Sequence, residues 1–366
     1  MDDNREKRMC DSRLDACKQE VHFASTDGRS SIYGAIWVPL LEGGRNPKGL
    51  VQLVHGMSEH SGRYRDFAAF LVSAGYAVCA NDHIGHGGSV SSDGYGYLPP
   101  DRGVDIMLED VDRMRRIAQD VVGHDVPYLI FGHSMGSLIV RAYIARHGEG
   151  IRGAVACGTA DRPAAIPLFG RFLIRMAALF RGWHAKATVF NNLANRRYTK
   201  DFRNENSPLA WISRNAENVR AYIADEVTGF TISLGAMYAL MKLGGEAMSV
   251  KTAKKVPPSL PVLFIAGADD PVGGNGRDVE HAERRLHAAG VADVGLILYG
   301  GMRHEVLNEV DHALVYADVA AWFDQQILKL ADAGGGTAGG AAGGGTGGGA
   351  AGGVGRIGKP GGPRSR

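Results

Sequence analysis

A serine, an aspartate and a histidine that could act together on an ester occur in this chain in that order. Ser134 is the central residue of GHSMG, residues 132–136, which has the pattern G-x-S-x-G. The pattern stands between the apolar run PYLIF (127–131) and a helix-like segment, so the serine is predicted on a sharp strand-to-helix turn. A serine hydroxyl needs a base, itself oriented by an acid, before it can attack a carbonyl.

The acid and the base follow, each directly after a predicted buried strand. The run PVLFIA (261–266) leads into Asp269 and Asp270, and the run 294–299 leads into GGMRH, which ends at His304. Either residue alone would be an ordinary turn or surface group. Their order and their positions after strands predict His304 as the base and Asp270 as the acid. Asp270 is preferred to Asp269 because the usual pattern around the acid in such folds is G-x-x-D-P, and residues 267–271 place Asp270 at its aspartate.

Hydrolysis of an ester also needs backbone N–H groups that bind the oxyanion of the tetrahedral intermediate. The residue after the nucleophile, Met135, is predicted to supply one from the start of its helix. The second is predicted from Met57, in the loop that follows the apolar run GLVQLVH (49–55).

The elements that must position these residues alternate along the chain. Strands are predicted at 21–24, 31–39, 49–55, 76–80, 127–131, 152–157, 261–266 and 294–299. Helices are predicted at about 64–74, 105–122, 135–147, 277–289 and 311–330. The alternation predicts an α/β fold with a mostly parallel, eight-stranded sheet covered by helices on both faces. In such sheets ligands bind beyond the carboxyl ends of the strands.

The alternation stops between residues 161 and 255, which are helix-rich and predicted as an inserted helical cap over the catalytic edge. The hydrolase core then comprises 20–160 and 256–332, after a polar lead at 1–19. Residues 333–366 are predicted as a disordered, glycine-rich tail, because they offer almost no apolar surface to offset the entropy of ordering.

Composition excludes several classes of protein. Apolar residues make up 45% of the chain and charged residues 22%, as in soluble globular proteins. The net charge of +2 comes from the tail, since removing its four basic residues leaves 37 Lys and Arg against 39 acids. We therefore expect no nucleic-acid partner.

Neither a signal peptide nor a transmembrane helix is recognisable, which predicts a cytoplasmic protein. The four cysteines match no metal-binding or redox spacing and are predicted as free, inert thiols.

Five segments resemble the monoacylglycerol lipase and lysophospholipase family of α/β-hydrolases. They are HGMSEHSGRY (55–64), NDHIGHGGS (81–89), FGHSMGS (131–137), AGADDPV (266–272) and YGGMRHEVLNE (299–309). The resemblance implies the α/β-hydrolase fold and hydrolysis of a lipid ester through an acyl-enzyme on Ser134, without a metal or another cofactor. The cap matches the family only loosely, so acyl-chain length and head group stay open.

The resemblance also assigns Glu59 and Arg63, of the segment HG-x-x-EH-x-x-RY, to the polar head of the substrate. An ion pair that fixes the oxyanion turn, the loop that contains Met57, is an equally good interpretation of these two residues. His83 and His86 are expected to be structural residues of their loop, because no acids or cysteines stand at metal-binding spacing.

Within the predicted cap, residues 167–182 form a basic amphipathic helix, with Arg171 and Arg175 opposite an apolar face. That face comprises Phe169, Phe172, Leu173, Met176 and Phe180. It could pack on the core, line an acyl tunnel, or dip into a membrane, and peripheral membrane contact is our hypothesis.

Three other functions share some or all of these features. A short-chain carboxylesterase would keep the same triad and differ in the pocket under the cap. A serine aminopeptidase would need an acidic site for the amine of its substrate, which the sequence does not reveal. A silent scaffold that binds a hydrophobic ligand would have no need for all three triad residues.

Overall fold

The computed structural model describes residues 8–11, 16–205 and 207–335 of the 366. The glycine-rich tail from residue 336 onward and most of the predicted polar lead lie outside these ranges.

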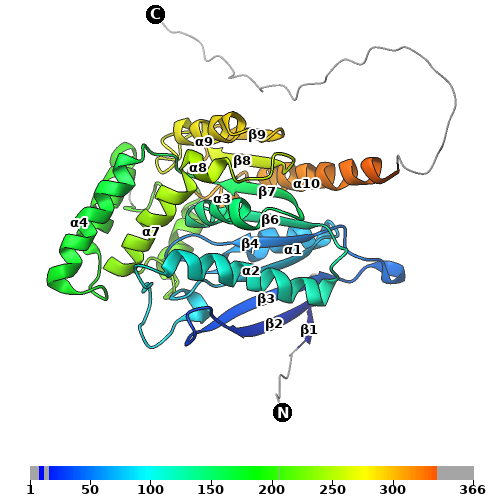
Figure 1. The fold of residues 1–366 in the computed structure, drawn as a ribbon, viewed down its shortest axis with the longest axis horizontal. Coiled ribbons are helices and arrows are strands. Elements are labelled where there is room, and N and C mark those ends of the chain that lie inside the picture. Colours follow the sequence, from blue (N-terminus) through cyan, green and yellow to red (C-terminus); the bar gives the residue numbers. More distant parts are fainter. Residues whose placement is uncertain (1–7, 12–15, 206, 336–366) are drawn as a thin grey trace, which may run out of the picture.

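The described strands form one sheet in the order β1-β2-β3-β5-β4-β6-β7-β8-β9, and Figure 1 shows the strands one above another, from β1 and β2 at the bottom to β9 at the top. The first three strands and β5 pair antiparallel, and all pairs from β5 to β9 are parallel. Their bounds are β1 Arg8–Asp11, β2 Ala16–Ala24, β3 Ser31–Pro39, β4 Leu50–Val54, β5 Ala77–Asn81, β6 Tyr128–His133, β7 Ile151–Cys157, β8 Val262–Gly267 and β9 Val294–Tyr299.

The eight predicted strands are present as β2 to β9, and the predicted mostly parallel sheet is confirmed. The short strand β1 adds a ninth at the edge, inside the predicted polar lead. Its four residues, RMCD, contain no apolar run, so no local pattern indicated this strand.

Helices cover both faces of the sheet. Helices α1 (Arg65–Ser73) and α10 (His312–Gly335) lie on one face, and α2 (Gly103–Val122), α3 (Met135–His147) and α9 (Arg277–Ala288) on the other. Strand β6 shows why both faces need cover: Tyr128 and Ile130 join one apolar core, whereas Leu129 and Phe131 join the other.

The chain between β7 and β8 is helical. It contains α4 (Ala165–Arg181), α5 (Thr188–Tyr198), α6 (Ala216–Ala224), α7 (Leu234–Ala247) and α8 (Val250–Ala253). Helix α4 packs on α7, which in turn packs on α2 and α3, and Figure 1 shows α4 as the outermost helix on that side. The division of the chain into a core and a cap at 161–255 stays a prediction.

Buried ion pairs fix the first residues of this helical segment on the core. The Asp161 carboxylate accepts hydrogen bonds of 2.7 Å from Arg141 on α3 and 2.7 Å from Arg285 on α9. The side chains of Asp161 and Arg141 are almost completely buried, and the next residue, Arg162, pairs with Asp278 at 2.7 Å. One carboxylate therefore joins the segment to two helices of the core.

One expectation about the cysteines is wrong. Cys79 and Cys157 are free and buried, but Cys17 at the start of β2 is disulfide-bonded. The spacing of cysteines along a sequence does not report which of them a hairpin brings together.

Replacing Asp161 by Asn should destabilise the fold by about 3–5 kcal/mol, because the buried Arg141 guanidinium loses its counter-charge. Urea unfolding of the two proteins measures the difference. The matched control is Asp120→Asn, which breaks an exposed pair with His124 and should cost less than about 0.5 kcal/mol. Similar losses in the two variants would contradict an anchoring role for Asp161.

Candidate active site

Ser134 stands on a strained turn between β6 and α3. Its backbone torsion angles, φ 55° and ψ −117°, are rare for any residue other than glycine. A Cβ on Gly132 would lie 2.3 Å from the Gly136 carbonyl oxygen, and a Cβ on Gly136 would lie 2.0 Å from the Val54 carbonyl oxygen. Only glycine fits at both positions, which explains the G-x-S-x-G pattern in physical terms.

The structure places Ser134, His304 and Asp270 in one hydrogen-bonded chain. The Oγ of Ser134 lies 2.9 Å from Nε2 of His304, and Nδ1 of His304 lies 3.0 Å from Oδ2 of Asp270. Asp270 is fully buried and accepts a second bond of 2.8 Å from the N–H of Val272, whereas Asp269 is exposed. The three groups therefore have the geometry that a serine nucleophile, its base and an orienting acid require.

Met57 and Met135 flank Ser134 from two sides. Met135 begins α3, so its N–H has no partner within the helix. Met57 follows Gly56, whose added Cβ would lie 3.1 Å from the Cβ of Ser134, so the loop after β4 runs close to the serine. Among the hydrogen bonds of the described residues, neither N–H has a protein acceptor. Both remain able to bind an oxyanion.

Glu59 and Arg63 are engaged by the protein itself. Glu59 accepts hydrogen bonds from the N–H of Gly56 at 2.6 Å and from Arg63 at 3.3 Å. The Arg63 guanidinium forms two parallel bonds to Glu305, of 2.7 and 2.8 Å, and donates to Asn218 on α6 at 2.9 Å. The side chains of Glu59, Arg63 and Glu305 are all at least nine-tenths buried.

Neighbouring charges keep these groups ionised in spite of their burial. Burial by itself would raise the pKa of Glu59, but its bond to His133 and the charge of Arg63 outweigh this and hold the pKa well below its ordinary value. Burial would lower the pKa of Arg63, but the Glu305 carboxylate more than offsets it, and the pKa is raised. We call Glu59, Arg63, Glu305 and His133 the buried charge cluster.

The sequence analysis missed two members of this cluster, Glu305 and His133, and its contact on the cap segment, Asn218. Glu305 and His133 each adjoin a triad residue in sequence, which was a usable signal. Asn218 is 87 residues from Glu305, to which its amide donates at 2.7 Å, and nothing in the sequence marked it.

His83 and His86 pack against His55 beneath the loop after β4, with ring centroids 4.2 and 5.4 Å from that of His55. The described residues hold no group of three or more His, Cys, Asp or Glu suited to a metal ion. Burial lowers the pKa of His55 to about 3, so this ring is neutral at ordinary pH.

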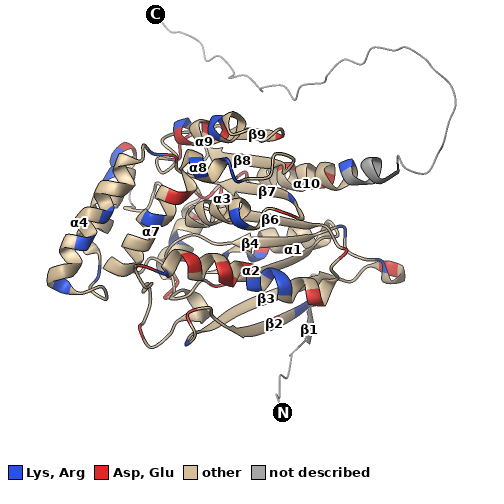
Figure 2. Ribbon diagram, in the orientation of Figure 1, with Lys and Arg blue, Asp and Glu red and all other residues tan. Residues whose placement is uncertain are grey.

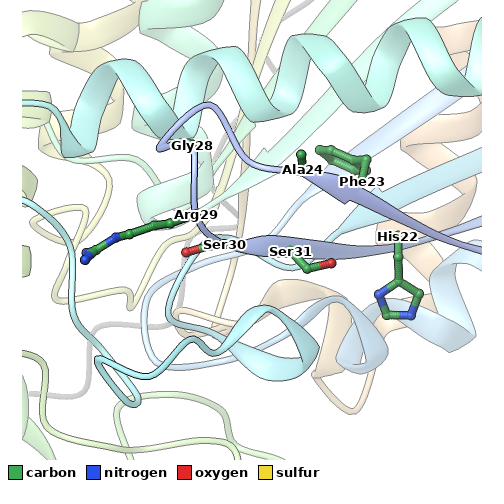
Figure 3. Close-up of a pocket in the computed structure, with 7 residues that line it drawn as sticks. All are labelled: His22, Phe23, Ala24, Gly28, Arg29, Ser30 and Ser31. Carbon is green, nitrogen blue, oxygen red and sulfur yellow. The ribbon is translucent and has the colours of Figure 1, made fainter.

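A surface hollow of about 350 Å³ lies at the hairpin between β2 and β3. Figure 3 shows residues His22–Ala24 and Gly28–Ser31 around it. The charged group among them, Arg29, is paired with Asp93 and Asp27. None of the predicted site residues lines this hollow.

The sheet, the strained serine turn and the residues that meet there define an α/β-hydrolase. A family model described as serine aminopeptidase, S33 matches residues 45–311, and the chain belongs to this family. The predicted resemblance to monoacylglycerol lipases is also confirmed.

Two curated relatives are similar over most of their length. The monoacylglycerol lipase of Mycolicibacterium smegmatis is 31% identical, over 84% of this chain and 98% of the relative. Human monoglyceride lipase is 27% identical, over 83% of this chain and 90% of the relative. Among solved structures, a thermostable carboxyl esterase from Bacillus coagulans in complex with glycerol superposes with a TM-score of 0.76 at 31% identity, covering 85% of this chain and 99% of the other. The chain is accordingly a serine ester hydrolase.

Asp270→Asn should lower kcat by about 10⁴-fold, because a neutral amide neither holds the His304 tautomer nor stabilises its imidazolium. Hydrolysis of p-nitrophenyl butyrate by the purified variant measures this loss. Asp269→Asn is the matched control, since this neighbouring acid is exposed. If the two variants lost activity equally, or Asp269→Asn lost more, Asp270 would not be the orienting acid.

Proposed function

We propose that this enzyme hydrolyses monoacylglycerols, with Ser134 as nucleophile, His304 as general base and Asp270 as the acid that orients it. The hydrogen-bonded chain from Ser134 through His304 to Asp270 carries the proposal, with its two links of 2.9 and 3.0 Å. The names of the two relatives above support a monoacylglycerol as the substrate.

In the first half of the reaction His304 Nε2 takes the proton of the Ser134 hydroxyl as Oγ bonds to the ester carbonyl carbon. The carbonyl electron pair moves to oxygen, where the N–H groups of Met57 and Met135 stabilise it. The intermediate collapses as His304 returns the proton to the departing glycerol oxygen, which leaves an acyl group on Ser134.

In the second half a water molecule replaces the alcohol. His304 removes a proton from this water as its oxygen bonds to the acyl carbon, and the same N–H groups stabilise the second oxyanion. The bond to Oγ then breaks and Ser134 regains its proton from His304. A fatty acid leaves, and no metal or other cofactor takes part in this scheme.

Glu59 and Arg63 act, in this proposal, as the ion pair that fixes the oxyanion turn. Both terminal nitrogens of the Arg63 guanidinium already donate to protein acceptors, two each, which leaves them no hydrogen for a phosphate. A neutral glycerol head therefore suits the site better than the head of a lysophospholipid.

The alternatives fit the site less well. An aminopeptidase needs a free carboxylate for the amine of its substrate, whereas the nearby Glu59 and Glu305 are paired with Arg63. A silent scaffold would not need the aligned triad. A short-chain carboxylesterase would share the triad, so only a comparison of substrates can separate it from a lipase.

Fatty-acid release should be strong with 1-oleoylglycerol, weaker with lysophosphatidylcholine and weaker with a short p-nitrophenyl ester. Ser134→Ala should abolish all three activities, at least about 10⁴-fold, because it removes the nucleophile. Turnover of the short ester alone would replace the proposal by a general carboxylesterase. Preference for lysophosphatidylcholine would make the enzyme a lysophospholipase, and activity that survives in Ser134→Ala would refute the mechanism.

We also propose that α4 contacts membranes peripherally. The apolar face expected from the sequence points to solvent, with Phe180 85% exposed and Phe169 62% exposed. The opposite side packs on the molecule through Ile174 and Ala178. A cluster of exposed large apolar side chains on one helix is unusual for a monomeric protein and typical of a membrane or protein contact.

The charge of the same region favours a membrane as the partner. Residues 165–198, from α4 through α5, contain six Lys and Arg and no Asp or Glu. Figure 2 shows basic positions along the length of α4. Apolar side chains flanked by arginines suit an interface of acyl chains and anionic head groups.

The double replacement Phe172→Ser and Leu173→Ser should weaken binding to vesicles of phosphatidylcholine and phosphatidylglycerol about 10-fold or more, because two exposed apolar groups are lost. Co-sedimentation measures this, and hydrolysis of a soluble short ester should be unchanged. Ile223→Ser, an exposed apolar position on α6, serves as the control. Unaltered vesicle binding by the double variant would rule out α4 as the contact.

No helix in the described part of the chain has the length and apolarity needed to span a bilayer. The cytoplasmic location stays a prediction, and the disulfide at Cys17 is unusual for that compartment.

A further inference from the structure

His133, the residue before the nucleophile, links three parts of the catalytic apparatus. They are the turn at Ser134 (the nucleophile turn), the loop after β9 that contains His304 and Glu305 (the histidine loop), and the loop after β4 that contains Gly56 and Met57 (the oxyanion turn). His133 is covalently joined to Ser134, and its Nε2 lies 3.2 Å from the carbonyl oxygen of His304. On the other side of the ring, Nδ1 lies 3.0 Å from the hydroxyl of Tyr64 and 3.5 Å from Oε1 of Glu59, the carboxylate that holds the oxyanion turn.

The partners of this ring determine where its protons are. A carbonyl oxygen only accepts, so Nε2 must carry the hydrogen that bonds to His304. The hydroxyl of Tyr64 donates its one hydrogen to Oε1 of Glu59 at 2.8 Å. Its oxygen can then only accept from Nδ1, and the Glu59 carboxylate also only accepts. With the Tyr64 hydrogen on its short contact to the Glu59 carboxylate, both ring nitrogens face acceptors, and an imidazolium satisfies all of these contacts.

The balance of buried charge leads to the same protonation state. The cluster contains two carboxylates, Glu59 and Glu305, and one guanidinium, Arg63, all buried. With a neutral His133 this would leave one uncompensated negative charge in the interior, which is strongly unfavourable. His55 does not supply the missing charge, because burial lowers its pKa to about 3.

We propose that His133 is a positioning residue that works as an imidazolium and holds the nucleophile turn, the histidine loop and the oxyanion turn in register. This inference rests on the proposed function, since it concerns the same site. The ring itself touches neither substrate nor the reacting atoms in the scheme above. It acts through the carbonyl of His304 and through Glu59, which binds the N–H of Gly56 beside Met57.

The groups that face His133 agree with this state. They are Glu59 and Tyr64 after β4, His304 and Glu305 in the histidine loop, and the uncharged Gly158 after β7. Burial by itself would lower the pKa of His133, but the hydrogen bond and charge of Glu59 and the charge of Glu305 outweigh it and raise the pKa above 6.5. The ring of His304 is 4.8 Å away, centroid to centroid.

The protonation state can be read from the long-range proton–nitrogen spectrum of full-length enzyme labelled with ¹⁵N-histidine. At pH 7 one ring should show the pattern of two protonated nitrogens, and His133→Gln should remove it. His124→Gln, at an exposed position on the surface, should leave it in place. A neutral tautomer at His133 would overturn the proposal.

Glu305→Gln tests the charge balance separately from the hydrogen bonds. Glu305 bonds to Arg63 and Asn218 but not to His133, so this change leaves the ring's partners in place. It should lower the pH at which the His133 ring titrates by at least one unit. Glu283→Gln on α9 is the matched control. No change in the titration of His133 would contradict the role of the cluster.

Kinetics test the positioning role. His133→Gln keeps a donor but removes the charge, and should lower kcat about 10- to 100-fold with little change in KM, since the oxyanion turn and His304 lose their register. Rates are expressed per active site titrated with a fluorophosphonate, so that loss of folded protein is not counted. An unchanged kcat would refute the positioning role.

The folding stability of the protein should also depend on pH through the charge of His133. A histidine with a raised folded pKa stabilises the protein fully below its unfolded pKa of about 6.5, and this contribution disappears as the pH rises through the folded value. The Tm of the wild type should therefore fall more between pH 7 and pH 9 than that of His133→Gln. Failure of wild-type Ser134 to react with the fluorophosphonate would refute the proposed function instead, whatever the state of His133.

Discussion

The close approach of the turn at Ser134 to the end of β4 is the constraint on which the site depends. The backbone at Gly136 passes so near the Val54 carbonyl that a single added carbon would lie 2.0 Å from its oxygen. This contact brings the start of α3 beside the loop that contains Met57, the two segments from which we propose that the oxyanion is bound. The backbone strain at Ser134 persists because the surrounding sheet and helix leave the turn no other path.

Around this turn the protein holds its loops with buried charge rather than with apolar packing alone. Glu59, Arg63 and Glu305 join the oxyanion turn to the histidine loop, and Asn218 extends the connection to α6. Ionic groups in such a place add little net stability, because desolvation offsets most of their attraction. What they add is directionality, since each bidentate or charge-assisted bond fixes an angle as well as a distance. A loop site that must keep two turns aligned gains more from this than from apolar contact.

The helices between β7 and β8 combine firm attachment with an exposed apolar face. Asp161 secures their first residues to α3 and α9, and Arg146 on α3 pairs with Glu246 near the end of α7. Between these anchors α4 presents Phe169, Phe172 and Phe180 to solvent. A segment fixed at both ends can keep an apolar surface exposed without unfolding, which is compatible with the membrane contact that we propose for α4.

Local patterns predicted the sheet, its helices and the candidate triad Ser134, Asp270 and His304, because strand-to-helix turns and the ends of buried strands carry such patterns. The pattern also favoured Asp270 over Asp269 as the acid, and in the structure Asp270 is buried and hydrogen-bonded to His304. Local patterns could not reveal β1, whose four residues pair by proximity alone, or the disulfide at Cys17. Nor could they decide whether Glu59 and Arg63 face a substrate or each other. That choice depended on Glu305 and Asn218, 242 and 155 residues from Arg63, and on burial that excludes water from the ion pair. Contacts between distant segments leave no periodicity in a single sequence, so only the tertiary structure could assign these charges.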